Sequence, residues 1–216
     1  MPGPTVARLP VYRRALGALV GGEATTVSSA ELARLTGVNA ATVRRDLSRL
    51  GSYGTRGTGY DAGQLLARVE RELALDREWP IVVVGVGNLG RALARSETFA
   101  SRGFRVAALV DVDPRLVGTV VAGLPIEPGD RLVEVVRREK VAFAVVATPP
   151  EAAQVVTDRL AEAGVRAILS FAPVRLRVPD GVRLRNVDLA AELQVLAFYG
   201  ARATHGADGP ETLARS

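Results

Sequence analysis

The segment Gly85-Val86-Gly87-Asn88-Leu89-Gly90 has the residue types and spacing of a phosphate-binding turn, because it directly follows the apolar run 81–84. In such a turn the first glycine permits the tight bend, the second lets the backbone approach a pyrophosphate, and the third allows a helix to pack closely. Asp111 ends the next apolar run, where a carboxylate bonds the hydroxyls of an adenine ribose. The pattern predicts a dinucleotide site.

The residues beyond the glycines indicate which dinucleotide binds. A carboxylate at Asp111 repels a 2′-phosphate, and Val112 follows it in place of an arginine, so NAD(H) is favoured over NADP(H). Thr148 and Pro149, at the end of a later apolar run, are expected to shape the nicotinamide pocket. Two alternatives stay open, a Rossmann-shaped domain with a vestigial site and a coenzyme A pocket, which also uses a glycine-rich first turn.

Side chains able to catalyse a reaction are scarce. The absence of cysteine excludes disulfides, thiolate metal ligands and cysteine nucleophiles. The single histidine, His205, lies in a polar tail, and Tyr199 and Lys140 are poor candidates for the proton donor that hydride transfer needs. We therefore expect no catalytic residue and no metal site, and a protein that binds NADH or NAD⁺ as a signal.

A second chemical signature is the stretch RRDLSRLGSYGTRGTGY, residues 44–60. Before it, Ser28 and Glu31 have the spacing of a capping box, so a short helix should run to about Thr36. Gly37 then supplies a left-handed turn, and Asn39 can cap the next helix. Two such helices form a helix-turn-helix, whose second helix enters the major groove of DNA.

The second helix of this motif has one apolar side and one basic side. Val43, Leu47 and Leu50 should face a core, which leaves five residues on the outer faces as expected DNA contacts: Thr42, Arg44, Arg45, Ser48 and Arg49. The glycines of 51–59 predict a β wing, in which Tyr53, Thr55 and the tip residue Arg56 contact DNA. The alternative for this wing is a structural turn with a solvated arginine.

The charge distribution agrees with a DNA-binding segment that precedes the dinucleotide site. Residues 1–60 hold eight arginines and three acidic residues (8 − 3 = +5), whereas the rest of the chain holds 20 basic and 20 acidic groups (20 − 20 = 0). The excess positive charge is therefore confined to the segment expected to meet phosphates, although an ordinary solvated basic face remains an alternative.

The elements that must position these residues follow from the apolar pattern. A first helix has Val6 to Val20 at helical spacing, and a later one spans 65–75 before a linker at 76–80. Beyond it, apolar runs at 81–84, 106–110, 141–147 and 167–169 alternate with helical patterns at 88–97, 131–139 and 151–163. The pattern predicts an α/β protein, with a winged helix-turn-helix domain over 1–78 and a Rossmann domain with a doubly wound parallel sheet over 79–216.

No apolar run approaches the length of a membrane span, and the first residues lack the apolar core of a signal peptide. We therefore expect a cytoplasmic protein without a membrane partner.

The chain resembles the Rex family of redox-sensing transcriptional repressors over nearly its full length. The stretches that carry the resemblance are residues 44–60, GVGNLG (85–90), DVDP (111–114), FAP (171–173) and NVDL (186–189). It implies a homodimer that binds a palindromic operator in double-stranded DNA when NADH is scarce and releases it when NADH accumulates. NAD⁺ would compete as the weaker ligand. Arg45 stands where the family usually has lysine.

The resemblance also implies a switch. Arg14 and Asp188 match residues whose ion pair ties the DNA module to the partner's nucleotide domain, and Asp188 would change partner when NADH binds. Many members supply that new partner as a tyrosine, where this chain has Ser96. Either Ser96 or another group takes that role, or the coupling differs. The last helix, about 188–203, resembles the segment that family dimers exchange, so it is expected to be a dimerisation helix. Packing on its own subunit is the alternative.

Two other functions remain as competitors, an NAD-dependent oxidoreductase and a coenzyme A-binding protein, each with an accessory basic domain. An oxidoreductase should turn over NADH with a carbonyl substrate, and a coenzyme A-binding protein should prefer that ligand to NADH.

Overall fold

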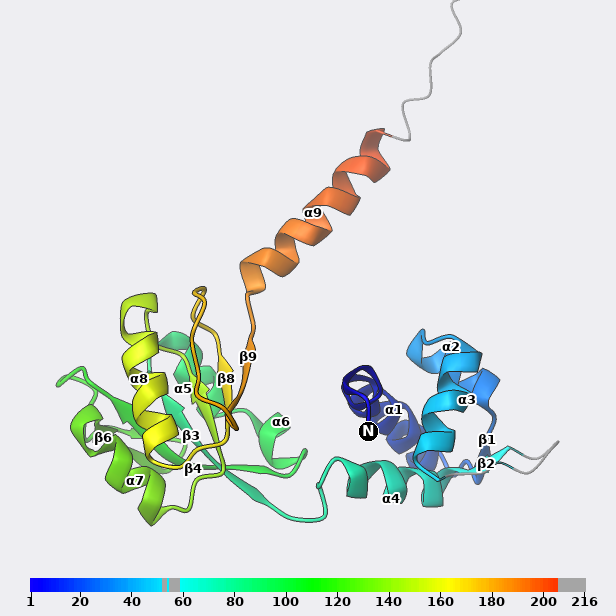
Figure 1. Ribbon diagram of the computed structural model, residues 1–216, viewed down its shortest axis with the longest axis horizontal. Coiled ribbons are helices and arrows are strands. Elements are labelled where there is room, and N and C mark those ends of the chain that lie inside the picture. The colour runs from blue at the N-terminus through cyan, green and yellow to red at the C-terminus, as the bar shows by residue number, and fades with distance from the viewer. Residues whose placement is uncertain (52–53, 55–58, 206–216) are drawn as a thin grey trace, which may run out of the picture. The chain divides into compact units, whose positions relative to one another are not determined.

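The computed structural model describes residues 1–51, 54 and 59–205, with side chains described as far as residue 201. The chain folds into two compact units, Met1–Glu78 and Trp79–Ser216. The first unit holds helices and one short β ladder, and the second holds a seven-stranded sheet with its helices (Figure 1).

The first unit is built from α1 (Gly3–Gly21), β1 (Thr26–Val27), α2 (Ser29–Thr36), α3 (Ala40–Arg49), β2 (Tyr60–Asp61) and α4 (Ala62–Glu72). Ser28 is the N-cap of α2, because the Glu31 amide donates to Ser28 Oγ, which is one of the two hydrogen bonds of the predicted capping box. Gly37 ends this helix with a φ of 70°, and the Ala41 amide donates to Asn39 Oδ1 at the start of α3. The helix-turn-helix therefore forms as its capping residues predict.

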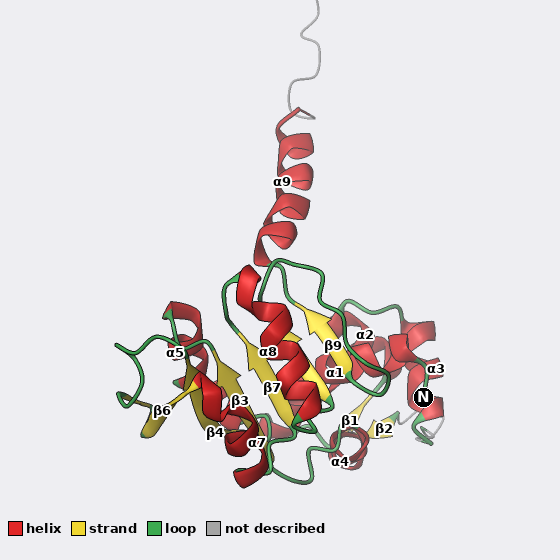
Figure 2. Cartoon of the chain, turned by 60° about the vertical axis from the view of Figure 1, so that its left-hand side comes forward, coloured by secondary structure: helices red, strands yellow, loops and turns green. Residues whose placement is uncertain are grey.

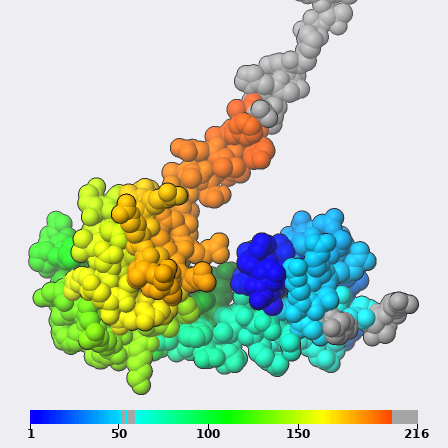
Figure 3. Space-filling view, viewed as in Figure 1, coloured from blue at the N-terminus to red at the C-terminus, as the bar shows by residue number. Residues whose placement is uncertain are grey.

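Apolar residues of all four helices make the core of this unit, together with Val27 of β1. Figure 3 shows the atoms of α1 against those of α2 and α3. Val43, Leu47 and Leu50 are fully buried, as predicted. In contrast, Val6 and Val20, the two ends of the helical apolar spacing in α1, are exposed and lie outside this core. Tyr12 takes a central place in the core, which its polar hydroxyl had hidden in the sequence pattern.

The base of the predicted wing is the antiparallel pair β1 and β2, in which Thr26 lies opposite Asp61. Gly59 has a φ of 87°, and a Cβ there would lie 2.6 Å from the Val27 carbonyl oxygen, so the close strand pairing requires glycine. The expected wing contacts Tyr53, Thr55 and Arg56 lie outside the described residues.

The second unit contains strands β3 (Trp79–Val84), β4 (Phe104–Asp111), β5 (Val120–Val121), β6 (Leu124–Pro128), β7 (Phe143–Val146), β8 (Ala167–Ser170) and β9 (Arg183–Asn186). Its helices are α5 (Asn88–Ala94), α6 (Glu97–Ala100), the 3₁₀ turn η1 (Gly129–Arg131), α7 (Leu132–Arg138), α8 (Pro150–Glu162) and α9 (Leu189–His205). The sheet order is β5-β6-β4-β3-β7-β8-β9, and every neighbouring pair is parallel except β5 with β6. This is the predicted doubly wound Rossmann sheet.

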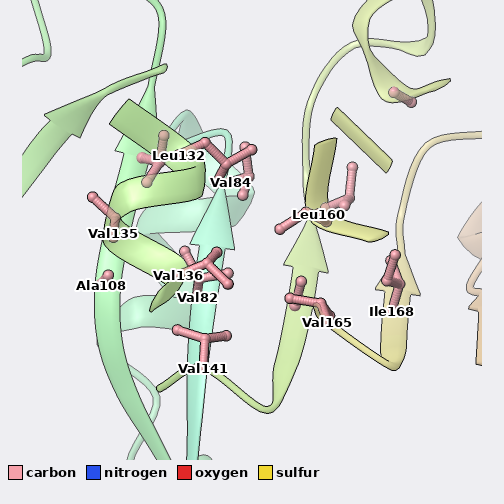
Figure 4. Packing of buried hydrophobic residues seen from close by; sticks show 14 of the residues in the cluster. Val82, Val84, Ala108, Leu132, Val135, Val136, Val141, Leu160, Val165 and Ile168 are labelled. Atoms are coloured by element: carbon pink, nitrogen blue, oxygen red, sulfur yellow. The ribbon is translucent and has the colours of Figure 1, made fainter. Parts of the chain in front are cut away.

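Helices pack on both faces of the sheet (Figure 2). Residues of α7 and α8 pack on one face, where Leu132, Val136 and Leu160 lie against Val82, Val84 and other strand residues (Figure 4). Residues of α5 and α6 pack on the other face, against Ile81, Val83 and Leu109. Alternate residues of β3 therefore enter two different cores, which explains why the strand is a continuous apolar run.

The chain order reverses between β3 and β7, because the strands after β3 continue to β4 and β6 on one side and to β7, β8 and β9 on the other. The carboxyl ends of β3 and β7 flank this switch point, which is where open α/β sheets bind ligands.

Several predicted boundaries differ from the structure. The linker ends at Glu78, since Trp79 already pairs with Phe104 and packs edge-on against Phe143 with ring centroids 5.0 Å apart. The predicted helix 88–97 is divided into α5 and α6 around Arg95 and Ser96. Strands β5, β6 and β9 were not predicted, because β5 is two residues long and β9 is largely exposed. Such strands carry little apolar signal.

Candidate functional site

A cavity of about 490 Å³ opens at the carboxyl ends of β3, β4 and β7. It brings together five of the predicted cofactor-binding residues, Gly85, Gly87, Asp111, Thr148 and Pro149. The rest of the lining consists of Val84, Val110, Val112, Asp113, Leu116, Gly129, Leu132, Ala147, Ala152, Val156 and Arg159. The wall is mainly apolar with a few polar groups, as is usual for a small-molecule site.

The three glycines have the geometry that the phosphate-binding turn predicts. Gly85 has a φ of 90°, and a Cβ there would lie 2.6 Å from the Ala147 carbonyl oxygen. A Cβ on Gly90 would overlap the Gly85 carbonyl oxygen, so this glycine lets α5 pack against the turn. A Cβ on Gly87 would meet no atom within 4 Å. The space at Gly87 is therefore open for a ligand to approach the backbone.

The other residues of the segment do not line the cavity. Val86 is fully buried in the core between the sheet and α5, whereas Asn88 and Leu89 are exposed in the first turn of α5. Arg91, one turn further along, donates from Nε to the Val86 carbonyl at 3.1 Å and supports the turn from outside. The segment therefore offers its backbone, and not these side chains, to a ligand.

Asp111 connects the end of β4 to the glycine turn. Its Oδ2 accepts a hydrogen bond from the Val86 amide at 2.6 Å, and its Oδ1 accepts one from the Asp113 amide at 2.9 Å. The carboxylate thus positions the turn, a role that the sequence pattern did not reveal. A carboxylate has further lone pairs on both oxygens, so ribose hydroxyls can still bond here.

Thr148 has a buried hydroxyl without a protein partner. Among the described residues, Thr148 Oγ1 and Arg68 Nε are the buried side-chain polar atoms that make no hydrogen bond. Leaving such a group unsatisfied costs roughly 1 to 3 kcal/mol. A polar group of a bound ligand would remove that cost. Together with the open backbone at Gly87, this hydroxyl fits a dinucleotide.

Sequence reasoning missed Arg159, the basic residue of the cavity wall. Its Nη1 and Nη2 donate to the carbonyls of Gly129 and Asp130, both at 2.8 Å, which fixes the guanidinium against the turn after β6. Ala152, Val156 and Arg159 lie at i, i+4 and i+7 on α8, so the helical period of this segment carried a signal for it.

The expected DNA-contacting residues of α3 are not all alike. Arg44, Arg45 and Ser48 are exposed, as predicted, and Thr42 is half-buried. Arg49 is exposed along 42% of its side chain, but its Nη1 donates to Thr5 Oγ1 of α1 at 3.0 Å. Arg49 is therefore tied to α1, whereas Arg44 and Arg45 belong to the outer face alone.

The group to which Arg49 is tied surrounds Asp46, a fully buried carboxylate on the apolar side of α3. Arg8 donates to it from Nε and Nη2 at 2.6 and 2.9 Å, and the hydroxyls of Thr5 and Tyr12 each donate at 2.8 Å. Burial raises the pKa of Asp46, but the hydrogen bonds from Arg8, Thr5 and Tyr12 outweigh it and hold the pKa below its ordinary value. Asp46 is therefore ionised and fixes α3 to α1.

Asp46 also affects its neighbour Tyr12. Burial, and then the hydrogen bond to the Asp46 carboxylate, raise the pKa of Tyr12 from 10.0 to about 12. The sequence held a signal for this cluster, since an acidic residue stood within the apolar stripe formed by Val43, Leu47 and Leu50.

The three expected switch residues lie in both units. Arg14 is exposed on α1 of the first unit. Ser96 is half-buried before α6, and its hydroxyl does not cap that helix. Asp188 Oδ1 accepts from the amides of Ala190 and Ala191, both at 3.0 Å, so this carboxylate caps α9.

Two apolar surfaces of the second unit are exposed. One is α9, where Leu189, Leu193, Leu196, Phe198 and Tyr199 are each more than half exposed. The other is a hollow of about 320 Å³ on the face of the sheet that bears α6, lined by Ile81, Phe99, Phe104, Phe143, Ala144, Val145, Ala167, Ile168, Leu169, Arg183 and Arg185. Each leaves apolar area in contact with water.

No helix among the described residues is long and apolar enough to cross a membrane. The same residues contain no cluster of histidine, cysteine or acidic side chains that could hold a metal ion.

Known proteins match both units. A family model described as "CoA binding domain" matches residues 76–174, and one described as "Putative DNA-binding protein N-terminus" matches residues 1–48. The redox-sensing transcriptional repressor Rex of Streptomyces coelicolor is 55% identical over 202 residues, which cover 94% of this chain and 78% of the relative.

Solved structures of RSP, a Rex-family repressor, are also similar. RSP in complex with β-NAD⁺ and operator DNA has a TM-score of 0.89 at 31% identity and covers 98% of this chain and 99% of that chain. RSP in complex with β-NADH has a TM-score of 0.86 at 30% identity and covers 96% of this chain and 98% of that chain.

Proposed function

The chain belongs to the Rex family of redox-sensing transcriptional repressors. We propose that the protein binds operator DNA through its first unit and releases the DNA when NADH binds to the second unit. The observation that carries this proposal is the cavity at the switch point of the sheet, where Gly85 and Gly87 leave the backbone open and the Thr148 hydroxyl lacks a partner. RSP supports it, because its solved complexes contain β-NADH, and β-NAD⁺ with operator DNA.

The residues that would hold the dinucleotide come from the ends of three strands. The backbone from Gly85 to Gly90 would receive the pyrophosphate, Asp111 the adenine ribose, and Thr148 with Pro149 the nicotinamide side. The side chains of Val86, Asn88 and Leu89 contribute little beyond shaping the turn. The nicotinamide supplies the redox state that is sensed, while these residues only bind and orient it.

Asp111 also distinguishes the competing ligands. Coenzyme A carries a phosphate on its adenine ribose, as NADPH does, and a carboxylate at that position repels such a phosphate. The match to a model described as "CoA binding domain" covers the fold of this unit. We therefore propose NADH and NAD⁺ as the ligands, in preference to NADPH and coenzyme A.

The DNA-reading side chains would be Arg44, Arg45 and Ser48 of α3, with Thr42 at its start. Arginine forms paired hydrogen bonds with guanine in the major groove, so Arg45 is the residue to which we assign base reading. The wing residues Tyr53, Thr55 and Arg56 complete the proposed contact with DNA.

We propose that the protein is a homodimer, because α9 and the hollow beside α6 both expose apolar side chains in this single chain. An exchange of α9 between two copies would cover apolar area on each. In such a dimer Asp188 at the start of α9 would meet Arg14 of the other copy in the DNA-bound state. Ser96 stands where many family members have the switch tyrosine, so either Ser96 or another group would become the new partner of Asp188 when NADH binds, or the coupling would differ.

The proposed repressor works in the cytoplasm, where bacterial DNA lies, and is not an enzyme. Support comes from its relatives, which are named transcriptional repressors. An oxidoreductase would consume NADH with some carbonyl compound, so absorbance at the NADH band in the presence of a carbonyl panel should stay constant.

The decisive experiment uses an operator selected by the wild-type protein from random-sequence duplexes. NADH should release the protein from this duplex at lower concentration than NAD⁺, and NADPH and coenzyme A should have little effect. If NADH left the affinity for DNA unchanged, the proposed switch would be wrong. Asp188→Ala provides the matched test of coupling, since it should keep NADH binding while reducing the loss of operator affinity, with coupling of about 1 to 3 kcal/mol in the wild type.

A further inference from the structure

The cluster around Asp46 holds two arginines beside the recognition helix, and their charges exceed that of the carboxylate. Arg8 contacts Asp46 directly, and Arg49 is joined to it through the Thr5 hydroxyl, with Arg49 Nη1 lying 4.0 Å from Asp46 Oδ1. Two guanidinium charges against one carboxylate leave one net positive charge. An internal ion pair made only to stabilise the fold would need one arginine.

We propose that Arg8 and Arg49 form a phosphate clamp, held in place by Asp46 and Thr5, that contacts the DNA backbone beside the major groove entered by α3. This inference rests on the proposed DNA binding of the first unit. It assigns Arg8, an α1 residue outside the helix-turn-helix, as a DNA contact, and it gives Arg49, one of the expected DNA contacts, a role at the DNA backbone.

The hydrogen bonds explain how one guanidinium can serve two partners. Arg8 uses the edge formed by Nε and Nη2 for Asp46, and a guanidinium carries more N–H donors than one carboxylate can accept. Its side chain is 27% exposed, so part of it reaches solvent while Asp46 is fully buried. A guanidinium fixed in this way loses little side-chain entropy when it meets a phosphate.

A comparison with Arg13 on the same helix shows what is special about Arg8. Arg13 donates from Nε to Glu70 of α4 at 3.0 Å, and its side chain is 28% exposed. Exposure and ion pairing are therefore nearly equal for the two arginines. Arg13 pairs one charge with one carboxylate from α4, whereas Arg8 belongs to a group that joins α1 to α3 and has one excess positive charge. Arg13 is thus the matched control for the clamp.

The test uses two charge-neutral double variants of the full chain, Arg8→Met with Asp46→Asn, and Arg13→Met with Glu70→Gln. Each removes one positive and one negative charge, so net charge stays constant. Binding to a mixed-sequence duplex is measured over a range of salt concentrations. Each lost phosphate contact lowers the slope of log affinity against log salt by about 0.9. We expect that decrease per protomer for the Arg8 pair and none for the Arg13 pair.

A slope equal to that of the wild type in the folded Arg8 pair would overturn the proposal. Arg49→Met gives an independent arm with the same expected decrease. If the wild type bound no DNA at all, the proposed function itself would be wrong. Failure of the clamp and failure of the proposed function therefore give different results.

A wild-type measurement covers the case in which the Arg8 pair does not fold. In NMR spectra of the arginine side chains, addition of the mixed-sequence duplex should shift the Nε–H resonances of Arg8 and Arg49 and leave that of Arg13 in place. Unshifted Arg8 and Arg49 resonances at saturating duplex would exclude the clamp.

Discussion

Asp46 and Asp111 tie a functional element to a neighbouring segment in the first and second unit, respectively, but with different kinds of donor. Asp46 is fully buried and accepts hydrogen bonds from three side chains of α1. Asp111 is half-buried at the wall of a cavity and accepts from two backbone amides. The first carboxylate is enclosed by protein groups, and the second still faces a space for a ligand. A carboxylate can therefore be an anchor or a binding group, according to what surrounds it.

The largest expected effect comes from removing the anchor. Asp46→Ala leaves the Arg8 guanidinium, the Thr5 hydroxyl and the Tyr12 hydroxyl without their acceptor, and should destabilise the first unit by about 3 kcal/mol. The single tryptophan, Trp79, lies in the second unit, so its fluorescence transition in urea should stay unchanged while the circular dichroism of the helices is lost earlier. Two unchanged transitions would contradict the role of Asp46 as an anchor.

The corresponding change at Asp111 should act on binding more than on folding. Asp111→Ala removes the acceptor of the Val86 and Asp113 amides and the proposed ribose contact, so NADH should bind about 2 kcal/mol more weakly. The affinity gap between NADH and NADPH should narrow, because the repulsive charge is gone. Calorimetry at one salt concentration measures both. Equal losses for NADH and NADPH would show that Asp111 does not select the ligand.

Gly87→Ala also separates an effect on NADH binding from an effect on folding, and its expected effect on affinity is smaller than that of Asp111→Ala. The added Cβ meets no protein atom within 4 Å, so stability should change by less than about 0.5 kcal/mol. It occupies the space where a pyrophosphate would approach, and NADH affinity should fall about tenfold. Gly85→Ala is the contrasting variant, because its Cβ collides with the Ala147 carbonyl and the fold itself should weaken. Unaltered NADH affinity in Gly87→Ala would place the ligand elsewhere.

The smallest expected effect is on the pH dependence of stability and concerns Tyr12. It is absent at neutral pH and appears only in alkaline solution. The pKa of Tyr12 is raised from 10.0 to about 12, so its contribution to stability is complete below pH 10 and is lost as pH rises toward 12. Because of Tyr12, the free energy of unfolding should fall less steeply between pH 10 and 12 in Tyr12→Phe than in the wild type. The opposite sign holds for Asp46, whose pKa is lowered, so its contribution to stability is complete above pH 3.8 and is lost in stronger acid. Parallel curves would show that Tyr12 ionises normally.

The sequence by itself determined the elements with local signals. Ser28, Gly37 and Asn39 fix the ends of their helices through capping and a left-handed turn, interactions within a few residues. The glycines at 85, 87 and 90 likewise predicted the phosphate-binding turn, because one tight bend determines their spacing. The apolar runs predicted the central strands, because a strand buried on both faces does not alternate apolar and polar residues.

Only the tertiary structure decided which polar residues meet. Asp46 and Arg8 are 38 residues apart, and Asp111 and Val86 are 25 apart, so no local pattern could join them. The missed strands β6 and β9 depend on pairing with β4 and β8 more than on their own composition. Arg159 of α8 lies in the cavity wall because its guanidinium donates hydrogen bonds to the carbonyls of the turn after β6. In each case the cause is a contact between residues far apart in the chain. The sequence contains both residues, but no local pattern shows that they are in contact.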